Sequence, residues 1–323
     1  MQMIETEGLS KNYDGLLAVD RLNLRIQEGE RFGLLGPNGA GKSTTLLMLT
    51  TLLRPTSGTA RVNGFDVVRQ PARVRRSIGV VFQDPSSDDT LTGYENLKLH
   101  GMLYGMPAAL REQRIGELLE LVELTARKDD VVKHYSGGMR RRLELARGLL
   151  HQPKVLFLDE PTLGLDPQSR EHIWRYIERL SHEQRTTMVL TTHYMEEVDQ
   201  LCDRLAIMDA GRIVALDTPA ALKQVIGGDV VVLQVDDTNL DRLQRLGYVT
   251  KIDRQQGMLY LTVTNAGVHL PEILQTAGAV ASVAVRSPTL NDVFLHYTGK
   301  EIHAESPEGG WAERSMHYSS RTR

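Results

Sequence analysis

The chain has 323 residues, 41% of them hydrophobic, which is enough for two globular domains with sizeable cores. Its 38 Lys and Arg residues against 41 Asp and Glu residues give a net charge of -3. This balance excludes a broad electrostatic attraction to nucleic acid or acidic lipid, so we expect no nucleic-acid partner. The single cysteine, Cys202, excludes an intramolecular disulfide, suits a reducing compartment and is expected to be a buried small hydrophobe.

The start of the sequence lacks the basic segment and apolar run of a secretory signal, so we expect the chain to stay in the cytosol. Nowhere do 18 or more apolar residues follow one another. If the protein serves a membrane, we expect another subunit to span it.

The first part of the chain alternates short apolar runs with amphipathic segments. Apolar residues spaced by two over 22–26 predict a strand, and a second strand over 31–35 leads into a glycine loop and a helix. Further strands over 78–82, 155–158 and 187–191, each followed by a helical stretch, predict a largely parallel α/β sheet.

Residues 91–150 carry no strand pattern and are expected to form a helical insertion, with 110–124 as its clearest amphipathic helix. Gly227 and Gly228 open a second rhythm of strand, helix, two strands, helix and strand, which predicts a small ferredoxin-like α+β domain. The expected domains are therefore residues 1–227, an accessory domain over 228–300 and a mobile tail over 301–323.

A phosphate-binding motif follows the strand at 31–35. The sequence Gly-Pro-Asn-Gly-Ala-Gly-Lys-Ser fits G-x-x-x-x-G-K-[ST] between a strand and a helix, and chance should match its constrained positions in only about one chain in a hundred of this length. Lys42 is predicted to contact the β and γ phosphates, and the Ser43 hydroxyl to bind Mg²⁺. Backbone N–H groups of the loop and of the helix start are predicted to hold phosphate oxygens. The nucleotide-binding residues of this segment are Gly36, Asn38, Gly39, Ala40, Gly41, Lys42, Ser43 and Thr44.

Two acids end the apolar strand at 155–158. They belong at the carboxyl edge of the sheet, beside the phosphate loop. Asp159 is predicted to hold Mg²⁺ directly or through water, and Glu160 to orient or deprotonate the water that attacks the γ phosphate. Acids at a strand end are common in solvated loops, but together with the phosphate loop they predict nucleotide hydrolysis.

A second glycine-rich segment, Tyr-Ser-Gly-Gly-Met over 135–139, precedes a helical stretch and predicts a second anion site. Here the sequence resembles the ABC transporter ATPase family, whose signature LSGGQ crosses a dimer interface to cap the γ phosphate bound by the partner chain. Ser136, Gly137 and Gly138 match that signature, whereas Tyr135 and Met139 depart from it. The resemblance implies a homodimer in which these three residues act in trans.

The family's remaining elements occur in its order. Tyr13 corresponds to the aromatic residue that stacks on adenine, and Gln83 to the Q-loop glutamine that reaches Mg²⁺ and the attacking water. Asp166 closes the D-loop and is expected to cross to the opposite subunit, and His193 is the switch histidine that hydrogen-bonds the γ phosphate. Taken singly, Tyr13, Gln83 and His193 would be interpreted as an edge residue, a loop residue and a helix cap.

The resemblance covers roughly residues 4–226 and narrows over 82–85, 135–142 and 287–294, which look like the daunorubicin-resistance type of drug-export ATPase. It implies ATP hydrolysis with Mg²⁺, a separate transmembrane permease and a location at the cytoplasmic face of the membrane. The basic run of Arg140, Arg141 and Arg142 is interpreted as a solvated helix face, because consecutive residues of a helix point in different directions.

Other interpretations stay open from the sequence. A non-transport ABC ATPase acting on ribosomes or in DNA repair is disfavoured by the single phosphate loop and the absence of sustained heptads. A small-molecule kinase would leave Ser136, Gly137, Gly138 and His193 without roles. The domain after residue 228 lacks a convincing cluster of His, Cys or acids, so we expect it to be a regulatory or dimer-supporting module.

Overall fold

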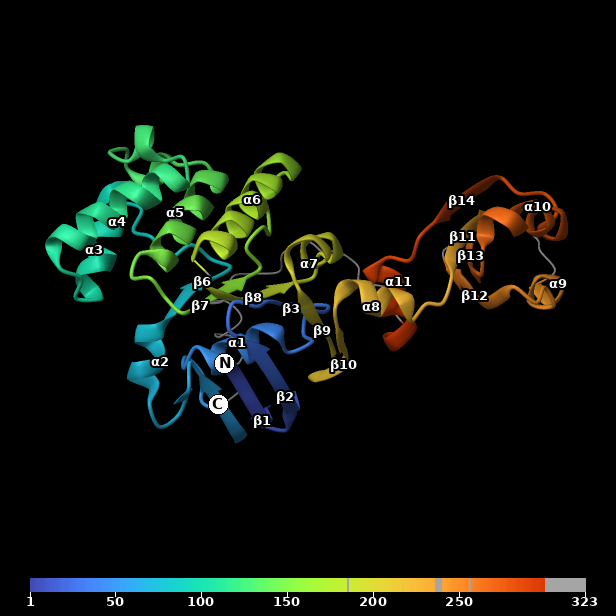
Figure 1. The fold of residues 1–323 in the computed structure, drawn as a ribbon, viewed down its shortest axis with the longest axis horizontal. Helices are drawn as coiled ribbons and strands as arrows, with labels where there is room; N and C mark the ends of the chain where they lie inside the picture. The colour runs from blue at the N-terminus through green and yellow to red at the C-terminus, as the bar shows by residue number, and fades with distance from the viewer. Residues whose placement is uncertain (185, 236–239, 256, 300–323) are drawn as a thin grey trace. The chain divides into compact units, whose positions relative to one another are not determined.

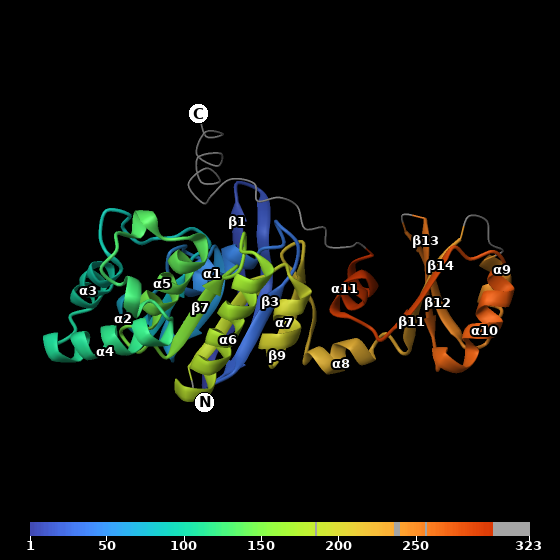
Figure 2. The ribbon, with the colours of Figure 1, turned by 90° about the horizontal axis from the view of Figure 1, so that it is seen from above.

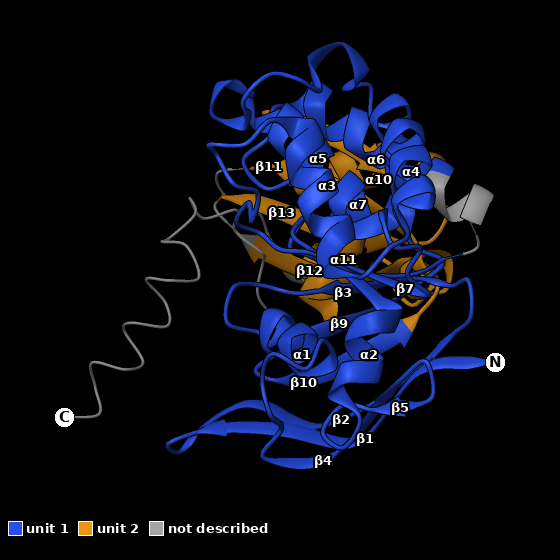
Figure 3. Cartoon of the chain, turned by 90° about the vertical axis from the view of Figure 1, so that its left-hand side faces the viewer, with its two compact units in different colours: residues 1–216, 303–323 blue, residues 217–302 orange. Residues whose placement is uncertain are grey.

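A computed structural model describes residues 1–184, 186–235, 240–255 and 257–299. Two compact units divide the chain between Leu216 and Asp217 (Figure 3), ahead of the boundary expected at residue 228. The difference arises because the helix α8 (Pro219–Gln224) packs against α11 (Leu290–Thr298), so it belongs to the second unit. The tail expected over 301–323 lies outside the described residues.

The first unit holds two sheets. The four-stranded sheet is antiparallel in the pairs β2–β1, β1–β4 and β4–β5. Its strands are β1 (Gln2–Tyr13), β2 (Leu16–Gln27), β4 (Ser57–Val62) and β5 (Phe65–Asp66). The six-stranded sheet has the order β10-β9-β3-β8-β7-β6. Its strands are β3 (Arg31–Leu35), β6 (Ile78–Val81), β7 (Val155–Asp159), β8 (Thr187–Thr192), β9 (Arg204–Asp209) and β10 (Arg212–Asp217).

The inner strands of the six-stranded sheet are parallel, as the sequence predicted. β3 pairs in parallel with β8 and β9, and β7 with β6 and β8. Every residue of β7 and β8 is buried, which explains their continuous apolar and threonine runs. The carboxyl ends of β3, β7 and β8 therefore meet at one edge of the sheet, where the phosphate loop begins.

Helices cover this sheet on both faces. α1 (Lys42–Leu49) contacts β7 and β8 on one side and β2 and β4 of the other sheet on the opposite side. α6 (Pro167–Gln184) and α7 (Met195–Leu201) lie together on the other face, where α7 contacts β3 and β8 (Figure 2). α2 (Pro71–Ser77) contacts β5 and β6. The buried core that includes Phe32, Leu46 and Phe157 fills the space between the sheets.

The segment over 91–150 is helical. It consists of α3 (Gly93–Leu103), α4 (Ala108–Leu121), α5 (Gly137–Leu149) and two 3-10 turns, η1 (Thr125–Arg127) and η2 (Val132–His134). α5 contacts both α3 and α4 as well as β6, so it joins the helical insertion to the sheet (Figure 1). No helix among the described residues combines the length and apolar character needed to cross a lipid bilayer.

The second unit confirms the predicted ferredoxin-like order of elements. Its antiparallel sheet has the order β12-β13-β11-β14. The elements are β11 (Asp229–Gln234), α9 (Leu240–Gln244), β12 (Val249–Gln255), β13 (Met258–Val263), α10 (Ala266–Ala277) and β14 (Ser282–Arg286). Its buried core, which includes Val231, Leu261 and Ile273, is separate from the core of the first unit.

Candidate functional site

The phosphate loop has the curled backbone that its sequence requires. Gly39 and Gly41 have φ of 80° and 100°, in the region that side chains rarely adopt, and Gly41 is the N-cap of α1. A Cβ on Gly36 would overlap the carbonyl oxygen of Met208, so only glycine fits where the loop leaves β3. The loop thus leads directly into the N-terminus of α1, whose backbone N–H groups favour an anion.

Lys42 is the first residue of α1 and is 4% exposed. Its Nζ donates hydrogen bonds to the carbonyl oxygens of Gly36 at 2.7 Å and Pro37 at 3.1 Å. The same Nζ lies 3.7 Å from a carboxylate oxygen of Glu160. A buried cation is therefore held between the loop and the end of β7.

Asp159 ends β7 and is tied to two neighbouring elements. Its Oδ1 accepts hydrogen bonds from the Ser43 hydroxyl at 3.2 Å and from the hydroxyl of Thr191 on β8. Burial raises the pKa of Asp159, while the hydrogen bond from Thr191 opposes that rise; the Glu160 charge adds to it and Ser43 and Lys42 oppose it. Asp159 therefore joins the start of α1 to the end of β8.

Glu160 is buried in a left-handed backbone conformation, with φ of 47°. Its N–H donates to the carbonyl oxygen of Thr191 at 3.0 Å, and Nδ1 of His193 lies 3.2 Å from Oε2 of Glu160. Lys42, Ser43, Asp159, Glu160 and His193 therefore converge at the carboxyl edge of the sheet. These are the residues that the sequence placed around the γ phosphate.

Tyr13 and Gln83 belong to segments that adjoin the phosphate loop and the end of β7. Tyr13 pairs with Leu16 at the end of the β1–β2 hairpin, and a Cβ on Gly41 of the phosphate loop would lie 2.5 Å from the carbonyl oxygen of Ala18 on the same strand β2. Gln83 follows β6, which is the parallel neighbour of β7, so it lies at the same edge of the sheet as Asp159.

The signature segment lies at the start of α5. Ser136 is the N-cap, and its hydroxyl oxygen accepts from the Met139 N–H at 3.3 Å. A Cβ on Gly138 would lie 3.3 Å from the hydroxyl oxygen of Ser169, which places the segment against the start of α6. Asp166 is exposed there and accepts from the Ser169 N–H at 2.9 Å. The contacts described for these residues lie at the starts of α5 and α6. None of the described contacts joins Ser136, Gly137, Gly138 or Asp166 to Lys42 or Asp159.

Tyr135, which replaces the first residue of the family signature, has a structural role. Tyr135 is 6% exposed, and its hydroxyl donates to the carbonyl oxygen of Arg127 at 2.7 Å. The tyrosine thereby ties the signature segment to the 3-10 turn η1 in the helical insertion.

The interpretation of the basic run as a solvated helix face is wrong for Arg141. Arg141 is 6% exposed and its guanidinium donates to the carbonyl oxygens of Phe82, Asp159 and Pro161. Burial lowers the pKa of Arg141 to about 10, so it stays charged near neutral pH. Three consecutive helical residues point in three directions, and here the direction of Arg141 faces the protein interior. The apolar residues at helical spacing from Arg141 were the signal that could have shown this.

Two further buried polar residues escaped the sequence analysis. Thr191 bonds both Asp159 and the backbone of Glu160, and only its place at the end of a buried strand hinted at this. Glu197 of α7 is fully buried and accepts from the Thr162 hydroxyl at 2.9 Å and from Trp174 Nε1 at 3.1 Å. It supports the turn that leads from Glu160 towards Asp166.

Cys202 is buried beside Gly33 of β3, as the sequence predicted, and burial raises the pKa of its thiol. Among the described residues no group of three or more His, Cys, Asp and Glu side chains could hold a metal ion by itself. The oxygens of Ser43 and Asp159 at the loop suit instead a Mg²⁺ ion that keeps most of its ligands from water and phosphate.

The site combines three features: a glycine-rich loop that opens a helix, an Asp-Glu pair at the end of the neighbouring strand, and a helical insertion with a second glycine-rich helix start. Together they define the nucleotide-binding cassette of ABC transporters. The comparisons with known proteins agree. Residues 19–163 match the family model described as ABC transporter, and residues 218–298 match the model described as ATP-binding protein DrrA1-3-like, C-terminal domain.

Curated relatives resemble the chain over nearly its whole length. The daunorubicin/doxorubicin resistance ATP-binding protein DrrA of Streptomyces peucetius is 43% identical over 322 residues, covering 97% of each chain. The linearmycin resistance ATP-binding protein LnrL of Bacillus subtilis (strain 168) is 36% identical and covers 93% of this chain and 99% of that protein. The chain therefore belongs to the ABC transporter ATP-binding proteins of the daunorubicin-resistance type, and it is an ATPase.

Solved structures share the cassette. The structure of cbiO1 from Clostridium perfringens, part of the ABC transporter complex cbiONQ, has a TM-score of 0.64 at 31% identity and covers 70% of this chain and 93% of that one. A dimeric cassette in a post-hydrolysis state bound to ADP and Pi has a TM-score of 0.62 at 28% identity and covers 67% of this chain and 98% of that one. This chain thus adds a C-terminal unit to a common nucleotide-binding fold.

Proposed function

We propose that two copies of the chain sandwich two MgATP molecules, each between the phosphate loop of one copy and Ser136, Gly137 and Gly138 of the other. The observation that carries this proposal is the convergence of Lys42 and Glu160 in one cluster while the signature segment contacts the start of α6. The cluster at the phosphate loop and the anion site at the start of α5 are separate. The site at the start of α5 is therefore available to a nucleotide held by another copy. The dimeric state of a similar solved cassette supports this arrangement.

The phosphate groups are held by the loop, and adenine stacks on Tyr13. Lys42 leaves the carbonyl oxygens of Gly36 and Pro37 for the β and γ phosphates, which offer it stronger charge-assisted hydrogen bonds. Asp166 crosses to the opposite copy. The backbone groups that complete the phosphate site are those of Asn38, Gly39, Ala40, Gly41, Ser43 and Thr44.

Hydrolysis uses the cluster at the end of β7. Glu160 orients the attacking water and takes its proton, and His193, 3.2 Å from it, hydrogen-bonds the γ phosphate. Ser43, Asp159 and Gln83 would hold a Mg²⁺ ion, which would neutralise charge on the β and γ phosphate oxygens. The buried surroundings of Asp159 and Glu160 strengthen these electrostatic contacts.

The test of the sandwich is the variant Glu160→Gln. It removes the general base while leaving the loop intact, so kcat should fall by about 10²- to 10⁴-fold with ATP still bound. Light scattering after gel filtration should show dimers with MgATP and monomers with MgADP. Monomers at saturating MgATP would contradict the sandwich.

We further propose that the dimer drives a separate transmembrane permease at the cytoplasmic face of the membrane and exports drug-like or lipid-like molecules. The names of the relatives, which concern resistance to daunorubicin and linearmycin and the export of Nod factors, support this cargo class. ATP favours the closed dimer because it contacts both copies, and ADP lacks that double contact.

Purification of the tagged chain from native membranes tests the partner. Recovery of a polytopic membrane protein, together with ATPase activity that Glu160→Gln abolishes, is the expected result. Recovery of ribosomes or DNA-repair proteins without a membrane protein would retain the ATPase and contradict transport.

The second unit is proposed to regulate or support the assembly rather than to bind nucleotide. Its core is separate from the core of the first unit, so deletion of residues 217–323 should leave nucleotide affinity within a few-fold of the full chain. The truncated protein should assemble less with the permease or lose regulation of its ATPase activity. Unchanged assembly and transport would contradict the proposal.

A further inference from the structure

Arg141 connects three segments of the nucleotide site through one side chain. Its Nε donates to the carbonyl oxygen of Pro161 at 2.5 Å, its second terminal nitrogen to that of Asp159 at 3.1 Å, and its first terminal nitrogen to that of Phe82. Pro161 and Asp159 flank Glu160 on both sides, and Phe82 directly precedes Gln83. A single planar fork therefore holds the backbone around both residues that are predicted to act on the attacking water.

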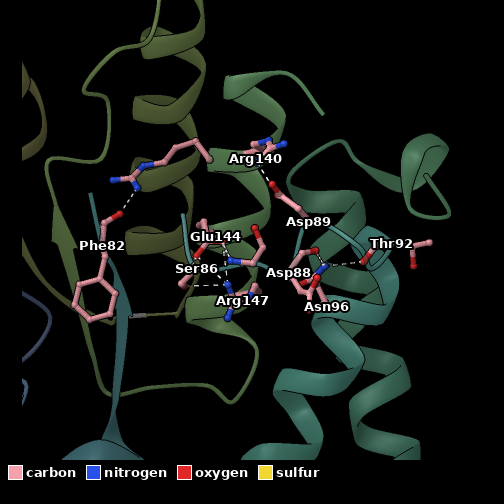
Figure 4. A network of polar contacts seen from close by, with 11 residues as sticks. Phe82, Ser86, Asp88, Asp89, Thr92, Asn96, Arg140, Glu144 and Arg147 are labelled. Carbon is pink, nitrogen blue, oxygen red and sulfur yellow. Dashed lines mark hydrogen bonds and ion pairs between the residues drawn. The ribbon is translucent and has the colours of Figure 1, made fainter. Parts of the chain in front are cut away.

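Glu144 lies one turn further along α5 on the same side of the helix and is 3% exposed. Its carboxylate accepts from the Ser86 hydroxyl at 2.9 Å and from the Ser87 N–H at 2.8 Å, and Arg147 pairs with it at 2.9 Å. Figure 4 shows Ser86 against Glu144 and Arg147 of α5, with Phe82 at the other end of the same loop. α5 thus holds the loop that carries Gln83 at both of its ends.

α5 is also the helix that the signature residue Ser136 caps at its N-terminus. Because helices move as rigid pieces, a displacement of Ser136 against a nucleotide in the other copy is carried along α5 to Arg141, little more than one turn away. The same displacement reaches the backbone on both sides of Glu160 through hydrogen bonds of a buried cation. The path from Ser136 to the backbone beside Glu160 therefore runs through one helix and one buried side chain.

We propose that Arg141 is a positioning residue for hydrolysis: it sets Glu160 and Gln83 of its own site according to how α5 of the same chain engages the nucleotide of the partner copy. This inference rests on the proposed function, since it requires that Glu160 activates water and that Ser136 acts in trans. It deepens that function by naming the side chain through which one nucleotide site communicates with the other.

The geometry sets the requirement at residue 141. Three donors of fixed direction reach three carbonyl oxygens in separate segments, which a lysine ammonium on a flexible stem cannot span at once. Arg141→Lys should therefore lower kcat as Arg141→Met does, although it keeps the charge. A displacement of a catalytic group by about 1 Å lowers a rate by about 100-fold, so we expect kcat losses of about 10- to 100-fold with the Kd for ATP within about threefold.

The experiment measures single-turnover ATP hydrolysis, ATP affinity and thermal unfolding in six full-length proteins: wild type, Arg141→Met, Arg141→Lys, Glu160→Gln, the double variant Arg141→Met/Glu160→Gln and a control. Arg142→Met is the matched control, because Arg142 stands on the same helix and also bonds a carbonyl oxygen, that of Val122, outside the nucleotide site. Its rate should stay within about twofold of wild type.

If Arg141 acts through Glu160 and Gln83, its loss should reduce the residual rate of Glu160→Gln by a clearly smaller factor than it reduces the wild-type rate, because one of the two groups that it positions is already disabled. A purely structural role would lower both rates by the same factor, and that result would overturn the inference. Equal losses in Arg141→Met and Arg142→Met would overturn it as well. Should Arg141→Met fail to fold, Arg141→Lys carries the same comparison.

The outcomes also separate this inference from the function beneath it. A full hydrolysis rate in Glu160→Gln would overturn the proposed role of Glu160 and the inference with it. A strong loss in Glu160→Gln alongside a wild-type rate in Arg141→Met and Arg141→Lys would retain the proposed function and reject only the positioning role of Arg141.

Discussion

The close approach of α5 to β6 makes Gly79→Ala a sharp test of the packing that carries the signature helix. A Cβ on Gly79 would overlap the carbonyl oxygen of Gly148 on α5, and it would lie 3.0 Å from both the Gly148 carbonyl carbon and Pro153 Cγ. The two overlapping groups are backbone, so no side chain can rotate away, and helix and strand must separate by about 1 Å. The expected cost is at the upper end of the overpacking range, about 3 kcal/mol.

For a unit of this size, about 1 kcal/mol lowers Tm by about 2 to 4 °C, so Gly79→Ala should unfold about 6 to 12 °C below wild type in differential scanning calorimetry. The control is Gly116→Ala, an exposed position in α4 where a Cβ meets nothing within 4 Å. That variant should be stabilised by about 0.5 to 1 kcal/mol, the usual gain of alanine over glycine inside a helix. A Gly79→Ala protein that unfolds within about 2 °C of wild type would refute the packing argument.

Thr191→Val keeps the shape of a buried strand residue but removes the hydroxyl that bonds Asp159, so kcat should fall by about tenfold in a steady-state ATPase assay. The control is Thr187→Val on the same strand, which loses a hydrogen bond from the Gly29 N–H and should keep its rate. Equal rates in the two variants would contradict this. In the second unit, burial alone would raise the pKa of Asp292, but hydrogen bonds from Arg286 and Thr289 outweigh it and the pKa is lowered. Its stabilisation is therefore present above the unfolded value of about 3.9 and is lost as pH falls through the lower folded value. Asp292→Asn should lower Tm at pH 7 and flatten its fall below about pH 4; an unchanged acid profile would contradict the assignment.

The local parts of the site could be predicted from sequence because contiguous residues carry them. The loop that ends at Lys42 and Ser43 needs only a strand before it and a helix after it, and the acids of β7 follow from an apolar run. Parallel strands bring such ends together at one edge, so the meeting of Asp159 with Ser43 was predictable in kind.

The rest depended on contacts between residues distant in sequence. The burial of Arg141 follows from α5 packing against the ends of β6 and β7, and a run of three arginines gives no sign of which one faces inward. Its spacing of four and seven residues from the buried Leu145 and Gly148 was the signal that could have found it. The glycine pair at 227–228 marks the start of β11, whereas the units divide at Asp217, because α8 finds its partner in α11 far along the chain.

The most direct test of the account asks whether the signature residues serve the nucleotide of another copy. Lys42→Ala disables the phosphate loop and Ser136→Glu disables the signature, so each variant alone should lack ATPase activity. Mixed in equal amounts, they form some dimers in which an intact loop of one copy faces an intact signature of the other, and hydrolysis should return to about a quarter of the wild-type rate, since half of the dimers are mixed and each holds one intact site. A mixture as inactive as its two components would contradict the sharing of the site between copies.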